Sequence, residues 1–117
     1  MITLTIAQSE VRDAVERLVD DIVAGRFQDL EADGRLGTTT AGELRNAVLH
    51  YGRTITHLPS EAWRLVDEFF DETRPDEISM DVPLWTVEEG RSDLTLSVSC
   101  RRDRTGISVA IEDLHVL

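Results

Sequence analysis

The sequence predicts an α+β domain in which N-terminal helices pack on one face of a C-terminal antiparallel β-meander. Apolar residues recur with a helical period before Arg74 and with a period of two after it. The chain has 117 residues, which is the length of one domain, so residues 1–117 are expected to form a single unit. Helices and sheet each carry one apolar face, and burying these faces against each other gives two layers.

The first expected element is a helix from Ser9 to Ala24. Ser9 is a suitable N-cap, and Gly25 is a suitable residue to end the helix. Phe27 and Leu30 extend the packing into a short second turn. The apolar residues of the helix fall on one stripe, and they are Val11, Ala14, Val15, Leu18, Val19 and Ile22.

A loop rich in glycine and threonine, residues 32–42, precedes the next long helix. Thr40 and Glu43 have the spacing of a capping box, which predicts a helix start, and Gly52 predicts its end. The apolar face of this helix holds Leu44, Ala47, Val48 and Tyr51.

The segment LPSEAWRLVDEFFDE, residues 58–72, fits two structures. Its apolar residues form a continuous helical arc with charged residues opposite, and Ser60 is a suitable cap, so we predict a helix. The aromatic and β-branched residues from Val66 to Phe70 keep an edge strand as the alternative, so residues 63–71 stay open between helix and strand.

Three strands are expected after Arg74, over residues 78–85, 94–100 and 107–111. Pro83 cannot donate a backbone hydrogen bond, which predicts an edge position or a strand end. The sequence RRDRTG joins the last two strands as a hairpin, with Gly106 available for positive φ. The apolar phases of the three strands are Ile78, Met80, Val82 and Leu84, then Leu94, Leu96, Val98 and Cys100, then Ile107, Val109 and Ile111.

The net charge of −11 limits the classes of partner. Nucleic acid and anionic membrane surfaces are disfavoured, because both need a basic footprint. All 12 basic residues are arginine, which excludes Schiff-base chemistry and a P-loop lysine. No apolar run spans a bilayer, and the start MITLTIAQSE does not resemble a signal peptide. With a single cysteine, Cys100, we predict a cytoplasmic protein.

Catalytic and metal-binding patterns are weak. Cys100 lies on the inward phase of its strand, and a tight turn at Arg104 and Thr105 would pair it near Val109, roughly 20 Å from His115. The three histidines lack metal-ligand spacing, and no cofactor motif is present. We therefore predict no enzyme, no cofactor and no metal site.

The stretch PLWTVEEGRSDLTL, residues 83–96, is interpreted as a strand end, an ordered acidic connection and the next strand. Trp85 lies on the polar phase, where it either anchors a partner or packs under the loop. Arg91 is placed to bridge Glu88, Glu89 or Asp93. The predicted partner-binding residues are Trp85, Glu88, Glu89, Arg91 and Asp93.

Three resemblances add to this interpretation. The stretches PLWTVEEGRSDLTL and EDLHVL, residues 112–117, are similar to a small uncharacterised bacterial α+β family of about this length. The N-terminal AVERLVDDIVAGRFQDLEADGR resembles the first helix of NTF2-like domains, which implies a pocket between helices and sheet. By type, a small acidic α+β domain also resembles immunity proteins of bacterial toxin–immunity pairs.

The predicted function is a non-catalytic cytoplasmic binding protein of immunity type, which neutralises a basic partner or toxin domain through an acidic surface. The alternative is an NTF2-like small-ligand-binding or enzymatic domain, which a concave pocket lined by His57, Asp81 or Glu112 would favour. A structural domain of a larger assembly is a third possibility. The expected oligomeric state is a monomer, or a homodimer formed through an exposed edge strand.

Overall fold

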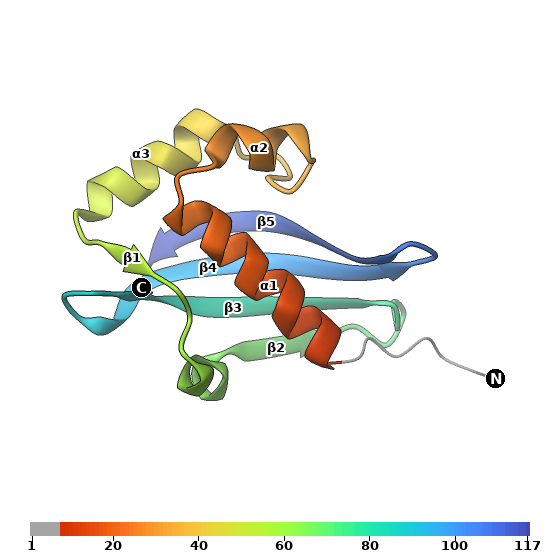
Figure 1. Cartoon of the computed structure of the whole chain (residues 1–117). Coiled ribbons are helices and arrows are strands. Elements are labelled where there is room, and N and C mark those ends of the chain that lie inside the picture. Colours follow the sequence, from red (N-terminus) through yellow and green to blue (C-terminus); the bar gives the residue numbers. More distant parts are fainter. Residues whose placement is uncertain (1–7) are drawn as a thin grey trace.

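The computed structural model has helices at the N-terminus and an antiparallel sheet at the C-terminus, so the predicted α+β architecture is confirmed (Figure 1). It describes residues 8–117, and residues 1–7, which belong to the stretch predicted not to be a signal peptide, lie outside this range. The helices are α1 (Gln8–Val23), α2 (Phe27–Ala32), α3 (Ala41–Tyr51) and the 3₁₀ helix η1 (Ser60–Leu65). The strands are β1 (Ile55–Thr56), β2 (Asp67–Phe70), β3 (Glu77–Thr86), β4 (Gly90–Asp103) and β5 (Gly106–Val116).

All strand pairs of the sheet are antiparallel, and β3 is its centre. The strand order is β1-β3-β4-β5, and β2 pairs with β3 as well. Because β4 occupies one edge of β3, the two short strands β1 and β2 share the other edge. The sheet therefore has β5 on one side and the pair of short strands on the other.

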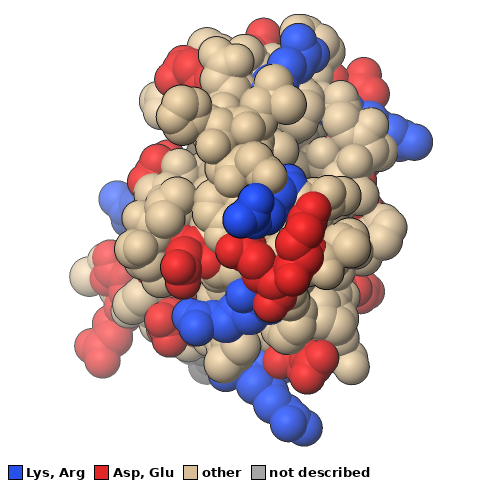
Figure 2. Space-filling model, turned by 90° about the vertical axis from the view of Figure 1, so that its left-hand side faces the viewer, with Lys and Arg blue, Asp and Glu red and all other residues tan. Residues whose placement is uncertain are grey.

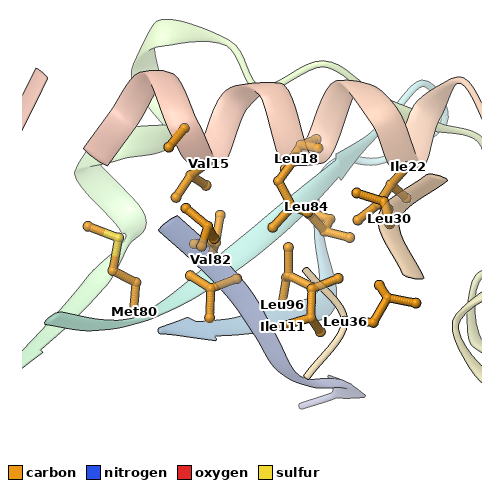
Figure 3. Packing of buried hydrophobic residues seen from close by; sticks show 14 of the residues in the cluster. Val15, Leu18, Ile22, Leu30, Leu36, Met80, Val82, Leu84, Leu96 and Ile111 are labelled. Carbon is orange, nitrogen blue, oxygen red and sulfur yellow. The ribbon is translucent and has the colours of Figure 1, made fainter. Parts of the chain in front are cut away.

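Helix α1 crosses one face of the sheet, and its apolar stripe forms the core with the inward phases of β3 and β4 (Figure 1). Val15 and Leu18 point toward Val82 and Leu84, and Ile22 lies beside Leu30 (Figure 3). Gly25, with φ of 74°, follows the end of the helix as predicted. The prediction of Ser9 as N-cap was wrong, because the helix already begins at Gln8 and Ser9 lies inside it.

The expected limits of α3 are confirmed by its end groups. The Thr40 hydroxyl oxygen accepts a hydrogen bond of 3.1 Å from the backbone N–H of Glu43. Gly52 ends the helix in the left-handed conformation, with φ of 75°. Thr40 thus satisfies one of the N–H groups that a helix start leaves without an internal partner.

The helix predicted within residues 58–72 was wrong, and the alternative of an edge strand is the correct one. The chain forms only the 3₁₀ helix η1, and Val66 then turns to an extended conformation with φ −83° and ψ 127°. From Asp67 to Phe70 it pairs with β3, opposite Asp81 to Ile78. This pairing gives hydrogen-bond partners to backbone groups on the edge of β3 that would otherwise have none. We infer that it stabilises the chain more than a longer helix would, because η1 buries only one side chain fully, that of Ala62.

Trp63 attaches η1 to the helical layer. Its ring is half-buried against the core, and its Nε1–H donates a hydrogen bond of 2.9 Å to the Glu16 carboxylate of α1. The Arg12 guanidinium lies 5.3 Å from the centre of the ring. These contacts hold the chain close to α1 immediately before β2 begins.

Pro83 lies at a position of β3 that, among residues 8–117, has no partner strand on the edge away from β4, so no backbone donor is needed on that edge. On that edge of β3, β2 pairs as far as Asp81 and β1 pairs with Trp85 and Thr86, so Pro83 lies between the two. The register with β4 also shifts between Pro83 and Trp85. The proline is therefore compatible with a strand that is central elsewhere along its length.

The hairpin of β4 and β5 has the predicted register, with Cys100 opposite Val109 and Asp103 opposite Gly106. Part of the outer edge of β5 is covered by the loop after α2, because the backbone N–H of Ile111 donates to the carbonyl oxygen of Arg35 at 2.8 Å. At Gly37, φ is 59° and an added Cβ would lie 2.7 Å from the carbonyl oxygen of Ile111. The loop can approach the strand this closely because residue 37 has no side chain.

Candidate functional site

The predicted partner-binding residues gather at one end of the sheet, around the turn between β3 and β4 (Figure 1). The two strands were expected over residues 78–85 and 94–100, but β3 extends to Thr86 and β4 begins at Gly90, so only residues 87–89 form the turn. Figure 2 shows acidic side chains near the middle of this end of the molecule, with arginine side chains above and below them.

Glu88 is bound to the chain between α3 and β1. Its carboxylate accepts hydrogen bonds of 2.8 Å from both the backbone N–H and the hydroxyl of Thr54, which is 34 residues earlier. These two hydrogen bonds from Thr54 hold the pKa of Glu88 below its usual value. Glu88 therefore links the turn to the segment between α3 and β1, and it also adds a negative charge to this end of the molecule.

Glu89 makes a similar link to α3. Its carboxylate accepts a hydrogen bond of 2.9 Å from the Tyr51 hydroxyl and one of 3.0 Å from the hydroxyl of Thr86. The backbone N–H of Glu89 donates to the same Thr86 oxygen at 3.0 Å. Sequence reasoning missed Tyr51 and Thr54 as partners of the two glutamates, because a separation of 34 to 38 residues leaves no local signal.

Trp85 and Arg91 lie opposite each other on β3 and β4, on the face of the sheet away from α1. The Trp85 ring is half-buried and packs on Gly90, with a closest approach of 3.7 Å to an added Cβ. Its Nε1 is buried without a hydrogen-bond partner among residues 8–117. Trp85 thus packs on the turn, which was one of its two expected positions, and keeps part of its surface accessible.

Arg91 and Asp93 are exposed on β4. The expected ion pair of Arg91 with Glu88, Glu89 or Asp93 was wrong, since none of these carboxylates lies within 4.0 Å in the described part of the chain. Both glutamates are instead directed toward Thr54 and Tyr51. The backbone carbonyl of Asp93 accepts a hydrogen bond of 3.0 Å from Leu117, so the strand also holds the C-terminus.

A second surface, at the opposite corner of the sheet, combines exposed aromatic rings with dense negative charge. Phe69 and Phe70 of β2 are 53% and 71% exposed. We call residues 67–77 the acidic edge, because they hold six carboxylates and one arginine, Arg74. The carboxylates are Asp67, Glu68, Asp71, Glu72, Asp76 and Glu77. The sequence did not predict this surface, because a helix over this segment would place both rings on its apolar face.

A cavity of about 700 Å³ opens between α1, the loop after α2 and the hairpin of β4 and β5. Glu112, one of the residues expected to line a ligand pocket, lies in its wall, whereas His57 and Asp81 do not. Arg35 in the wall is paired with Asp21 and Asp33 at 2.9 Å, and Glu77 with Arg74 and Arg101 at 3.4 and 3.7 Å. Most of the positive charge in the cavity is therefore neutralised by the protein itself.

The only cysteine is unsuited to nucleophilic chemistry. Cys100 is fully buried in the core, and burial raises the pKa of its thiol to about 12. Within residues 8–117, no group of three or more histidine, cysteine, aspartate or glutamate side chains is arranged to hold a metal ion. In the same range, no helix combines the length and apolar character needed to cross a membrane.

Residues 19–117 match the model of a protein family described as a domain of unknown function, DUF7668. The chain belongs to this family. The DUF7668 match covers both the turn of β3 and β4 and the acidic edge, and it leaves out residues 8–18 of α1. No match was found among curated proteins or among solved structures.

Proposed function

We propose that this DUF7668 protein is a non-catalytic binding protein of immunity type, which neutralises a basic partner such as a toxin domain. The acidic edge carries the proposal. Of its six carboxylates, only Glu77 forms an ion pair in the described part of the chain, with Arg74 and Arg101. The other five are available to a basic surface, next to two exposed aromatic rings.

The charge supports fast association with a basic protein. A net charge of −11 attracts a positively charged partner over distances of about one Debye length, which is about 8 Å at physiological salt. Such steering raises the association rate and makes it depend on salt. Phe69 and Phe70 would then supply apolar contacts, which charge alone does not give.

The state of Cys100 supports two further parts of the proposal, the absence of catalysis and the cytoplasmic location. The thiol of Cys100 is buried, and burial raises its pKa to about 12, so almost no thiolate is present to attack a substrate. Its isolation as a free cysteine is typical of proteins in a reducing compartment. A binding role needs neither a nucleophile nor a metal.

The test is the affinity for the protein encoded next to this gene, measured by titration calorimetry at several salt concentrations. We expect a tight complex whose affinity falls steeply as salt rises, and inhibition of any toxic activity of the neighbour. A neighbouring product that is acidic, or one that does not bind at low salt, would count against the proposal.

The cavity favours a second function, the binding of a small ligand between helices and sheet. Its volume of about 700 Å³ is within the range of ligand pockets, and Glu112 lies in its wall. An NMR titration with a panel of small carboxylates and amines tests this function. Saturable shifts confined to residues of the cavity would support it, and their absence across the panel would exclude ligands of these two classes.

A further inference from the structure

Among residues 8–117, strand β2 has a pairing partner on only one of its two edges. This partner is β3, which pairs with Asp67 to Phe70. In an antiparallel strand, alternate residues direct N–H and C=O groups to opposite sides, so half of these backbone groups face outward. A free edge of this kind is a template for another strand.

The two phenylalanines lie on opposite faces of this edge. Phe69 is opposite Ser79, on the face away from α1, whereas Phe70 is opposite the buried Ile78, on the face toward α1. At 53% and 71% exposure, both rings leave apolar surface next to the free backbone groups. A strand added beside β2 would cover part of both rings, because its side chains alternate between the same two faces.

The charge around the edge determines which kind of strand fits. Five of the six carboxylates of the acidic edge have no ion pair in the described part of the chain. Pairing of β2 with a second copy would bring both sets of carboxylates together, and like charges across an interface oppose binding. A strand rich in arginine or lysine would instead neutralise them.

We propose that β2 binds its partner by strand addition, and that the partner contributes an extended segment that carries both basic and apolar residues. The inference deepens the proposed function and rests on it. Backbone hydrogen bonds would supply the common part of the affinity, the phenylalanines the apolar contacts, and the carboxylates the preference for a basic sequence.

The probe is a ten-residue peptide of alternating arginine and valine, and its control is the same peptide N-methylated at four consecutive central residues, two arginines and two valines. Because alternate residues direct their N–H groups to opposite sides, these methyl groups block both edges of the control peptide. Both peptides carry the same charge, but the second cannot form a complete set of backbone hydrogen bonds. We expect the first to bind the full chain and to protect the amides of residues 67–70 from hydrogen exchange, and the second to bind about tenfold or more weakly.

Two matched variants locate the site. Phe70→Thr should weaken binding of the peptide by about tenfold, as expected for an aromatic anchor. Val87→Thr changes a side chain of equal exposure, 71%, in the turn of β3 and β4, and should leave the affinity unchanged. Thermal unfolding of both variants confirms that each is folded.

Four outcomes would overturn the inference. Equal binding of the two peptides would show that charge alone is recognised, and protection at residues 87–91 would place the site at the turn. A dimer through β2 in the absence of peptide, detected by analytical ultracentrifugation, would identify a second copy as the occupant. Failure of the first peptide to bind would exclude strand addition. The proposed function would still stand in that case if the neighbouring protein bound in a salt-sensitive way.

Discussion

Tyr51 and Glu89, 38 residues apart in the chain, are joined by a hydrogen bond of 2.9 Å from the phenol hydroxyl to the carboxylate. With the bonds from Thr54 to Glu88, this contact ties the end of α3 and the start of β1 to the turn of β3 and β4. Two residues selected from the sequence as candidates for recognition therefore also hold the fold together.

The contribution of this contact can be measured with a double-mutant cycle. Tyr51→Phe should lower the free energy of unfolding by about 1 kcal/mol or less, because the bond is near the surface. Glu89→Gln should cost a similar amount, and the double variant should cost less than the sum. Urea unfolding of the four proteins gives the coupling energy. Strict additivity would mean that the hydrogen bond contributes nothing to stability.

Glu88 predicts a dependence of stability on pH. Hydrogen bonds from Thr54 lower its pKa in the folded protein below the ordinary value of 4.5, so the unfolded chain binds the proton more readily. The stabilisation is fully present above pH 4.5 and is lost as the pH falls through the lower pKa of the folded state. We expect Glu88→Gln to lower the thermal midpoint relative to the wild type at pH 7, and the difference to shrink below pH 4.5.

The matched control for Glu88 is Glu72→Gln. Glu72 is an exposed carboxylate that accepts no hydrogen bond from residues 8–117. Its variant should keep a difference from the wild type that varies little over the same pH range. A pH dependence of equal size in both variants would show that net charge, and not the bonds from Thr54, is responsible.

Gly37 should tolerate substitution less well than Gly34. Gly37 and Gly34 both have positive φ, of 59° and 74° respectively. A Cβ added at Gly37 would lie 2.7 Å from the Ile111 carbonyl oxygen, whereas a Cβ added at Gly34 would have no neighbour within 4 Å. Gly34→Ala should cost about 1–2 kcal/mol from the left-handed conformation alone. Gly37→Ala should cost more, measured by urea unfolding. Equal losses would contradict a close approach of the loop to β5.

Cys100 should react with a thiol reagent only when the protein unfolds. Burial raises its pKa to about 12, so almost no thiolate is present at pH 8, and the side chain is inaccessible. Reaction with Ellman's reagent should be very slow in buffer and fast in urea. Rapid reaction of the folded protein would indicate that the core around β4 opens.

Much of the sheet could be predicted because its determinants are local. Ile78, Met80, Val82 and Leu84 recur at the period of a strand, and each is buried in the structure. The turn at Gly106 likewise set the register of the last hairpin. The polar phase of Trp85 predicted its face of the sheet, although its packing on Gly90 depends on the width of the turn.

The sequence by itself determined the two-layer α+β architecture, the buried stripes and the acidic charge, because each follows from composition or from a short period. Only the tertiary structure decided the state of residues 67–70 and the roles of Glu88 and Glu89. The first depended on an available edge of β3, and the second on Thr54 and Tyr51, which are distant in the chain. Local patterns carry no information about such contacts, because chain closure and packing bring the partners together.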